Sequence, residues 1–114
     1  MHEMSLVQAL LTQLAGLAAE HDKKRVISVT LAIGPLSGVV IDSFQFGFDI
    51  LAAESSLTKE AKLIITSPPA SYQCIRCSYH QPSAVRPDSC PQCGETLLIP
   101  EGGDGIILNQ VEME

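Results

Sequence analysis

The chain has 114 residues, a formal net charge of −6, and 46% hydrophobic residues. A chain of this length supports one modest core, and its acidic balance argues against nucleic acid as a partner. No apolar run approaches the roughly 20 residues that span a membrane, and the first residues lack the positive region of a signal peptide. We therefore expect a cytoplasmic protein without a membrane partner.

Leucines at helical spacing predict an amphipathic helix over residues 5–20, with Leu6, Leu10 and Leu14 on its buried face. Ser5 and Gln8 match a capping box, which predicts that the regular helix starts just after Ser5. The residues before Ser5 are then expected to lie outside the helix, with uncommitted backbone groups.

Alternating apolar residues predict a strand over residues 27–33, which Gly34-Pro35 ends. A second capping box, formed by Asp42 and Gln45, predicts a helix over residues 43–53. Aromatic side chains supply large burial, so the three phenylalanines of the chain are expected to pack in the core, with a ligand-binding role as the alternative. These phenylalanines are Phe44, Phe46 and Phe48.

Two further strands are predicted over residues 61–66 and 106–111, and the cysteine-bearing segment lies between them. The fold class is therefore α+β, with two helices packed on a small mixed three-stranded sheet and an inserted zinc-ribbon-like module. We expect residues 1–69 and 100–114 to form the α/β domain and residues 70–99 to form the metal-binding module.

All four cysteines of the chain fall in two Cys-x-x-Cys pairs, separated by a loop long enough to fold back. This spacing can bring four thiolates to the corners of a tetrahedron, the geometry of a closed structural zinc site. Pro91 and Gly94 fit a tight turn whose backbone N–H groups can point at sulfur. The predicted zinc ligands are Cys74, Cys77, Cys90 and Cys93.

Three other uses of these cysteines compete with a zinc site. Two disulfides require an oxidising compartment, to which nothing in the chain directs it. A redox Cys-x-x-Cys requires only one pair, normally at the start of a helix in a thioredoxin-like unit. Iron in a rubredoxin-like tetrathiolate is the serious alternative, because cysteine spacing does not separate iron from zinc.

The N-terminus offers a second and different set of donors. A bulky residue at position 2 normally prevents removal of the initiator methionine, which leaves the amine on Met1. The Met1 amine, the His2 amide nitrogen and the His2 imidazole can chelate one ion, with the Glu3 amide or carboxylate near a fourth position. Planar nitrogen donors favour Ni(II) or Cu(II) over tetrahedral zinc. The ordinary alternative is that His2 is an exposed residue of a frayed terminus.

Four motifs, in this order, give the chain a resemblance to a known family. They are the opening Met1-His2-Glu3-Met4-Ser5-Leu6, the segment Gly34-x-Leu36-Ser37-Gly38-Val39, the pair Phe46-x-Phe48 before Asp49, and the two cysteine pairs. Together they resemble the HypA/HybF family of nickel-incorporation proteins in hydrogenase maturation.

This resemblance implies a metallochaperone without catalytic activity, which carries Ni(II) as cargo and holds structural Zn(II). It implies that His2 is the essential nickel ligand, that Met1 and Glu3 complete the nickel site, and that the four cysteines bind zinc. The implied partners are a HypB-type GTPase and the precursor of the nickel-iron hydrogenase large subunit, and urease is a further client of some members. A homodimer is a further assignment that the sequence leaves open.

The alternative function is a zinc-ribbon module for protein interaction, without a nickel role. Electron transfer at an iron tetrathiolate is a third, and catalysis is disfavoured because no recognisable catalytic set of residues is present. His80, between the cysteine pairs, is expected to be an exposed loop residue, with a thiolate or metal contact as its alternative.

Overall fold

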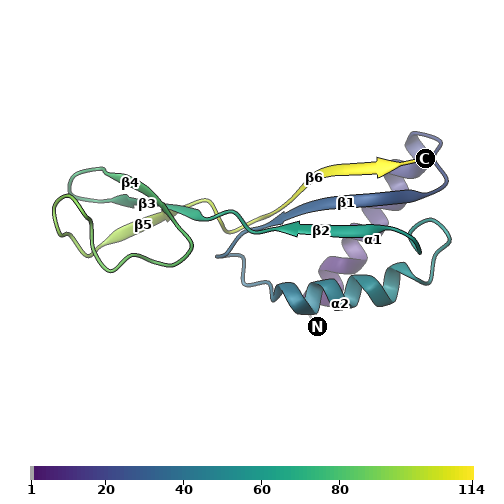
Figure 1. Cartoon of the computed structure of the whole chain (residues 1–114), viewed down its shortest axis with the longest axis horizontal. Helices are drawn as coiled ribbons and strands as arrows, with labels where there is room; N and C mark the ends of the chain where they lie inside the picture. The colour runs from purple at the N-terminus through teal and green to yellow at the C-terminus, as the bar shows by residue number, and fades with distance from the viewer. Residues whose placement is uncertain (1) are drawn as a thin grey trace. The chain divides into compact units, whose positions relative to one another are not determined.

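The structure is a computed structural model that describes the backbone of residues 2–114 and the side chains from Glu3 onward. Its elements are α1 (His2–Glu20), β1 (Val26–Ile33), α2 (Ile41–Ala52), β2 (Lys62–Thr66), β3 (Ala70–Cys74), β4 (His80–Ser83), β5 (Leu98–Glu101) and β6 (Ile106–Met113) (Figure 1). They divide into two compact units. Unit 1 comprises residues 1–32, 39–66 and 107–114, and unit 2 comprises residues 33–38 and 67–106.

Unit 1 contains a mixed sheet in the order β2-β1-β6 (Figure 1). β1 and β2 are parallel, and α2 supplies the crossover that parallel neighbours require. At the start of β1, Arg25 and Glu114 exchange both backbone hydrogen bonds at 2.9 Å, the pattern of an antiparallel pair. The predicted two helices and small mixed sheet are thus confirmed.

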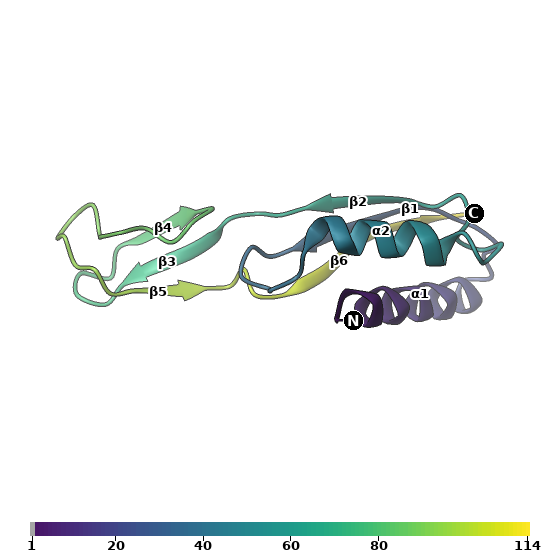
Figure 2. The same ribbon diagram turned by 90° about the horizontal axis from the view of Figure 1, so that it is seen from below.

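The core of unit 1 lies between its helices and its sheet. α1 packs against α2, as Figure 2 shows, and α2 packs against β2. The predicted buried leucines Leu10 and Leu14 are confirmed, and Phe44 and Phe48 of α2 are each only 1% exposed. Further core residues of unit 1 are Val7, Ala18, Val26, Val29, Leu31, Ala52 and Leu63.

The predicted start of the first helix is wrong. α1 already begins at His2, so Ser5 lies within its first turns and is not the residue at which the helix starts. The first N–H groups of any α-helix have no acceptor in a preceding turn. Inclusion of His2 and Glu3 in the helix therefore does not commit their amides to intrahelical hydrogen bonds.

The capping box predicted for the second helix is also wrong. α2 begins at Ile41, its N-cap residue is Val40, and no side chain of the cap residue bonds to the helix. Gln45 instead donates from Nε2 to Asp49 Oδ1 at 3.0 Å, one turn further along the helix. The Val40 N–H donates to the Glu3 carboxylate at 3.3 Å, so this acceptor at the start of α2 comes from a segment 37 residues away in the sequence.

Phe46 is a third correction, because 67% of its surface is exposed where core packing was predicted. Phe44 and Phe48 are four positions apart and share one face of α2. Phe46 lies two positions from each of them, which places it on the opposite side of the helix.

Unit 2 contains an antiparallel sheet in the order β4-β3-β5. Its core comprises Ala70, Tyr72, Cys74, Cys90 and Leu98. The loop before the second cysteine pair is held by Arg86, which donates from Nη2 to the Leu98 carbonyl at 2.8 Å. The Arg86 guanidinium also lies 5.9 Å from the centroid of the Tyr72 ring.

The units differ from the predicted division at residues 33–38, 67–69 and 100–106, which belong to unit 2. The Gly34 N–H donates to the Gly105 carbonyl at 2.9 Å, and the Leu36 N–H donates to the Gly103 carbonyl at 2.6 Å. These backbones pass so closely that a Cβ on Gly34 would collide with the Gly103 carbonyl. Glycine at position 34 is therefore what permits the pairing that assigns these segments to unit 2.

Within the described residues, neither helix combines the length and the apolar character needed to cross a membrane.

Candidate functional site

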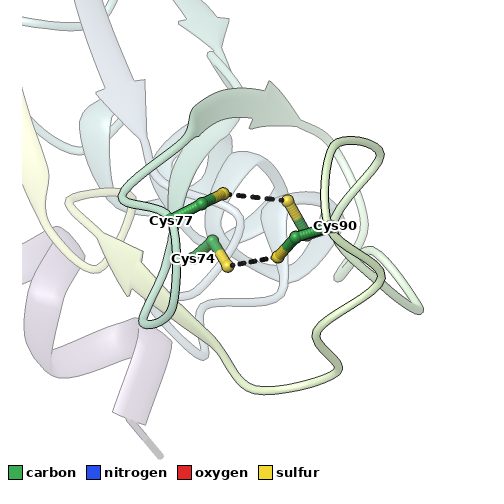
Figure 3. Close-up of side chains that lie close together, drawn as sticks. Cys74, Cys77 and Cys90 are labelled. Atoms are coloured by element: carbon green, nitrogen blue, oxygen red, sulfur yellow. Dashed lines mark hydrogen bonds between the residues drawn. The ribbon is translucent and has the colours of Figure 1, made fainter.

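The four predicted cysteine ligands converge in unit 2, and their sulfurs all lie within 4.8 Å of one another. The Cys74 and Cys93 sulfurs are 3.5 Å apart, as are those of Cys77 and Cys90 (Figure 3). A tetrahedral ion with metal–sulfur bonds of about 2.3 Å separates its ligands by about 3.8 Å. The cluster therefore fits one tetrahedral metal ion. All four cysteines are free thiols, so the alternative of two disulfides does not describe this structure.

The first cysteine pair folds as a tight backbone knuckle at the end of β3. The Cys74 N–H donates to the Tyr79 carbonyl at 2.9 Å, and the Ser78 N–H donates back to the Cys74 carbonyl at 3.0 Å. To close this turn, Ser78 adopts a positive φ of 65°. That conformation strains a residue with a Cβ.

The second pair repeats this knuckle. The Cys90 N–H donates to the Glu95 carbonyl at 2.7 Å, and the Gly94 N–H donates to the Cys90 carbonyl at 2.9 Å. Gly94 has a φ of 79°, and it occupies the place that Ser78 has in the first knuckle. The Gln92 N–H points at the Cys90 sulfur at 3.4 Å. The predicted tight turn with an N–H group directed at sulfur is thus confirmed.

The two knuckles predict opposite responses to substitution. Gly94→Ala should destabilise unit 2 by about 1 kcal/mol, because its φ is positive although a Cβ there would meet no neighbour. Ser78→Gly should relieve the strain of the positive φ at Ser78. The free energy of unfolding of unit 2 should then rise by between zero and about 1 kcal/mol, because the freedom that glycine gains in the unfolded chain offsets part of the relief. Both tyrosines of the chain, Tyr72 and Tyr79, lie in unit 2, so tyrosine fluorescence during denaturant unfolding measures this effect.

Gly16→Ala is the matched control, because Gly16 lies on the exposed face of α1 with open space around it. Alanine there should stabilise the helix of unit 1 without moving the tyrosine transition. Equal loss of unit 2 stability in Gly94→Ala and Ser78→Gly would contradict the knuckle interpretation.

The thiols of the cluster differ in how readily they ionise. Burial opposes ionisation of Cys90, but the backbone N–H groups of Cys93 and Gln92 lower its pKa to about 7. The Tyr79 N–H lowers the pKa of Cys77, but desolvation and the neighbouring thiols raise it to about 12. Four thiolates therefore do not coexist here near neutral pH unless a cation balances their charge, as a coordinated metal does.

His80 is exposed, as predicted, but it begins strand β4 and does not lie in a loop. Its Nδ1 lies 3.5 Å from Glu101 Oε1, which belongs to β5. Its recorded partner is therefore a carboxylate and not one of the thiols.

Of the predicted nickel residues, His2 and Glu3 begin α1, in the other unit. Met1 and the His2 side chain are outside the described residues. The Glu3 carboxylate accepts from Val40 N–H, and a carboxylate at the N-terminus of a helix is favoured by the helix dipole. A Cβ on Gly47 would come within 2.7 Å of the Met4 sulfur, so Gly47 lets Met4 pack closely against α2.

Two residues that support this first turn were missed from the sequence. Val40 supplies a backbone N–H, which no side-chain pattern reveals, and Gly47 supplies only the absence of a side chain. A glycine between two core phenylalanines was the available signal for a close helix contact.

Two helices with a mixed sheet in unit 1, together with the four-cysteine cluster of unit 2, define a small α+β metal-binding protein. A family model described as "Hydrogenase/urease nickel incorporation, metallochaperone, hypA" matches residues 1–113. The chain belongs to this HypA family.

Relatives of full length support this assignment. The chain is 35% identical over 113 residues to the "Hydrogenase maturation factor HypA" of Azorhizobium caulinodans, covering 99% of each chain. It is 35% identical over 114 residues to the protein of the same name from Alkalilimnicola ehrlichii, covering 100% of both.

Two solved structures share the fold. The solution structure of the Ni metallochaperone HypA from Helicobacter pylori has a TM-score of 0.68 and 26% identity, covering 97% of this chain and 96% of that one. A second HypA solution structure has a TM-score of 0.73 and 27% identity, covering 100% of this chain and 97% of that one. The protein is thus a nickel-incorporation metallochaperone and maturation factor, not an enzyme.

Proposed function

We propose that this chain binds Ni(II) at its N-terminus and delivers it during maturation of nickel-iron hydrogenase, with urease as a second client. The cysteine cluster of unit 2 holds a structural Zn(II). The observation that carries the proposal is the family match over residues 1–113, which includes a histidine directly after Met1.

The nickel ion is bound by the Met1 amine, the His2 amide and the His2 imidazole. These groups close small chelate rings, and such nitrogen donors suit Ni(II). The position of His2 and Glu3 in the first turn of α1 supports this set, because the amides of a first turn have no intrahelical acceptor.

Glu3 completes the site with its amide nitrogen in preference to its carboxylate. The carboxylate already accepts a hydrogen bond from Val40 at the start of α2, and its transfer to a metal would remove that contact. The amide has no such competing role within its helix.

Zinc in the cysteine cluster keeps unit 2 folded. Sulfur separations of 3.5 Å match a tetrathiolate site, and the two knuckles that carry the cysteines also build the core of the unit. The positive charge of Zn(II) balances the negative charge of the thiolates, and Zn(II) does not undergo redox chemistry. A coloured purified protein would indicate iron in its place.

The partners of this activity are a HypB-type GTPase and the precursor of the hydrogenase large subunit, and a homodimer is the oligomeric form proposed. The place of action is the cytoplasm, where the client is made. Neither nucleic acid nor a membrane takes part.

An N-terminal extension tests the nickel proposal. A short Gly-Ser segment retained before Met1 turns its amine into an amide, and nickel affinity should fall at least about 100-fold because a direct ligand is lost. Zinc content should not change. Isothermal titration with Ni(II) measures the effect, and the same segment added after Glu114 is the matched control. Equal nickel affinity in both proteins would favour the zinc-ribbon interaction module without a nickel role.

A further inference from the structure

The outward face of α2 carries an apolar pair that the fold of unit 1 does not use. Phe46 is 67% exposed and Ile50 is 46% exposed. They are four positions apart, so their side chains are neighbours on the helix surface. The opposite face of the same helix buries Phe44 and Phe48, so α2 is apolar on two sides. A surface helix that only covers a core is apolar on one side.

Acidic residues flank this pair. Asp42, Asp49 and Glu54 are all exposed, and residues 41–54 contain no lysine, arginine or histidine. Asp42 is four positions before Phe46, Asp49 is three positions after it, and Glu54 is four positions after Ile50. Asp42 and Asp49 therefore lie beside the pair on the helix surface, and Glu54 lies in the turn just after α2.

We propose that the outward face of α2 is a docking surface for a partner protein that presents an amphipathic, basic helix. Apolar side chains of that helix cover Phe46 and Ile50, and its flanking lysines or arginines meet the three carboxylates. This arrangement combines an aromatic anchor at the centre with complementary charges at the rim. It does not depend on which metal the N-terminus carries.

A second copy of this chain is a poor occupant. Two α2 helices packed face to face would bring Asp42 and Asp49 of one copy against those of the other, and like charges across an interface oppose association. The net charge of −6 adds to this repulsion and favours a cationic partner.

A pair of synthetic peptides tests the proposal on the full-length protein. Each peptide has about 15 residues, enough for a few helical turns, with leucine on one face and either lysine or glutamate on the other. We expect the lysine peptide to bind, with amide chemical-shift changes concentrated at residues 42–54 and weaker binding as salt rises. We expect the glutamate peptide not to bind.

Phe46→Ala should weaken binding of the lysine peptide at least about tenfold, as loss of a central aromatic anchor does. Val85→Ala removes an equally exposed apolar side chain from unit 2, and it should leave the affinity unchanged. Nickel titration of Phe46→Ala should match the native protein, which separates this test from that of the nickel site.

Four results would each overturn the proposal. They are no binding of the lysine peptide at low salt, equal binding by Phe46→Ala, equal binding of the glutamate peptide, and a native dimer that dissociates on Phe46→Ala in sedimentation experiments. The last would assign the surface to a second copy of the chain.

Discussion

Replacing His2 with glutamine, which keeps a bulky residue at position 2 and so retains Met1, is expected to abolish nickel binding and to leave the zinc content and the fold intact. The imidazole is a direct ligand in the proposed site, so nickel affinity should fall by at least about 100-fold. The cysteine cluster belongs to unit 2, and His2 belongs to unit 1. Isothermal titration with Ni(II), zinc analysis and helical circular dichroism provide the three readouts. Simultaneous loss of nickel and zinc would contradict two independent sites.

Two substitutions at Glu3 sharpen this experiment, because they separate its amide from its carboxylate. Glu3→Pro removes the N–H that would be deprotonated, and proline is tolerated in the first turn of a helix. Glu3→Ala keeps the amide and removes only the carboxylate that bonds Val40. If the amide is the fourth donor, nickel affinity falls strongly in the proline variant and little in the alanine variant. A larger loss in the alanine variant would assign coordination to the carboxylate.

The order of the helices and strands of unit 1 could be predicted from the sequence, but the ends of the helices and the strands of unit 2 could not. Hydrophobic periodicity is a local property, and it correctly indicated both helices and the strands of the mixed sheet. The cap of α2 is not local, because the Glu3 carboxylate that accepts from Val40 is 37 residues away. Asp42 matches the local capping pattern, but α2 already begins at Ile41, before that residue.

Phe46 shows a second limit of periodicity. Phe44, Phe46 and Phe48 alternate, and aromatic composition alone assigns all three to the core. An α-helix buries residues four apart and turns the intervening one outward. Periodicity alone does not show whether the outward residue meets solvent or a partner protein.

The convergence of the four cysteines could be predicted because two Cys-x-x-Cys pairs have diagnostic spacing. Of the two positive-φ residues that close the knuckles, only one could be predicted from the sequence. Gly94 is a typical residue for a positive φ, but Ser78 adopts the same conformation without a glycine to signal it. Closure of the first knuckle between Cys74 and Tyr79 imposes that conformation on Ser78.

Replacing Cys74 with serine is expected to release the metal and unfold unit 2. A structural zinc ion contributes on the order of 10 kcal/mol to folding of the module that binds it, so loss of one thiolate removes a large share of its stability. Tyr72 packs in the same core as Cys74. Tyrosine fluorescence should therefore report the unfolding. The helices α1 and α2 lie in unit 1, and helical circular dichroism should persist.

Cys77→Ser distinguishes metal loss from a packing defect. Cys74 is fully buried, so serine there also places a hydroxyl in the core, whereas Cys77 is exposed. If the cluster holds a structural metal, both variants should lose metal, and tyrosine fluorescence should show that unit 2 is destabilised in both. Retention of metal and stability by Cys77→Ser, with only Cys74→Ser unfolded, would mean that these cysteines act as core residues. The sulfur separations of 3.5 Å between the two knuckles favour the first outcome, because each knuckle supplies half of the ligands of one tetrahedron.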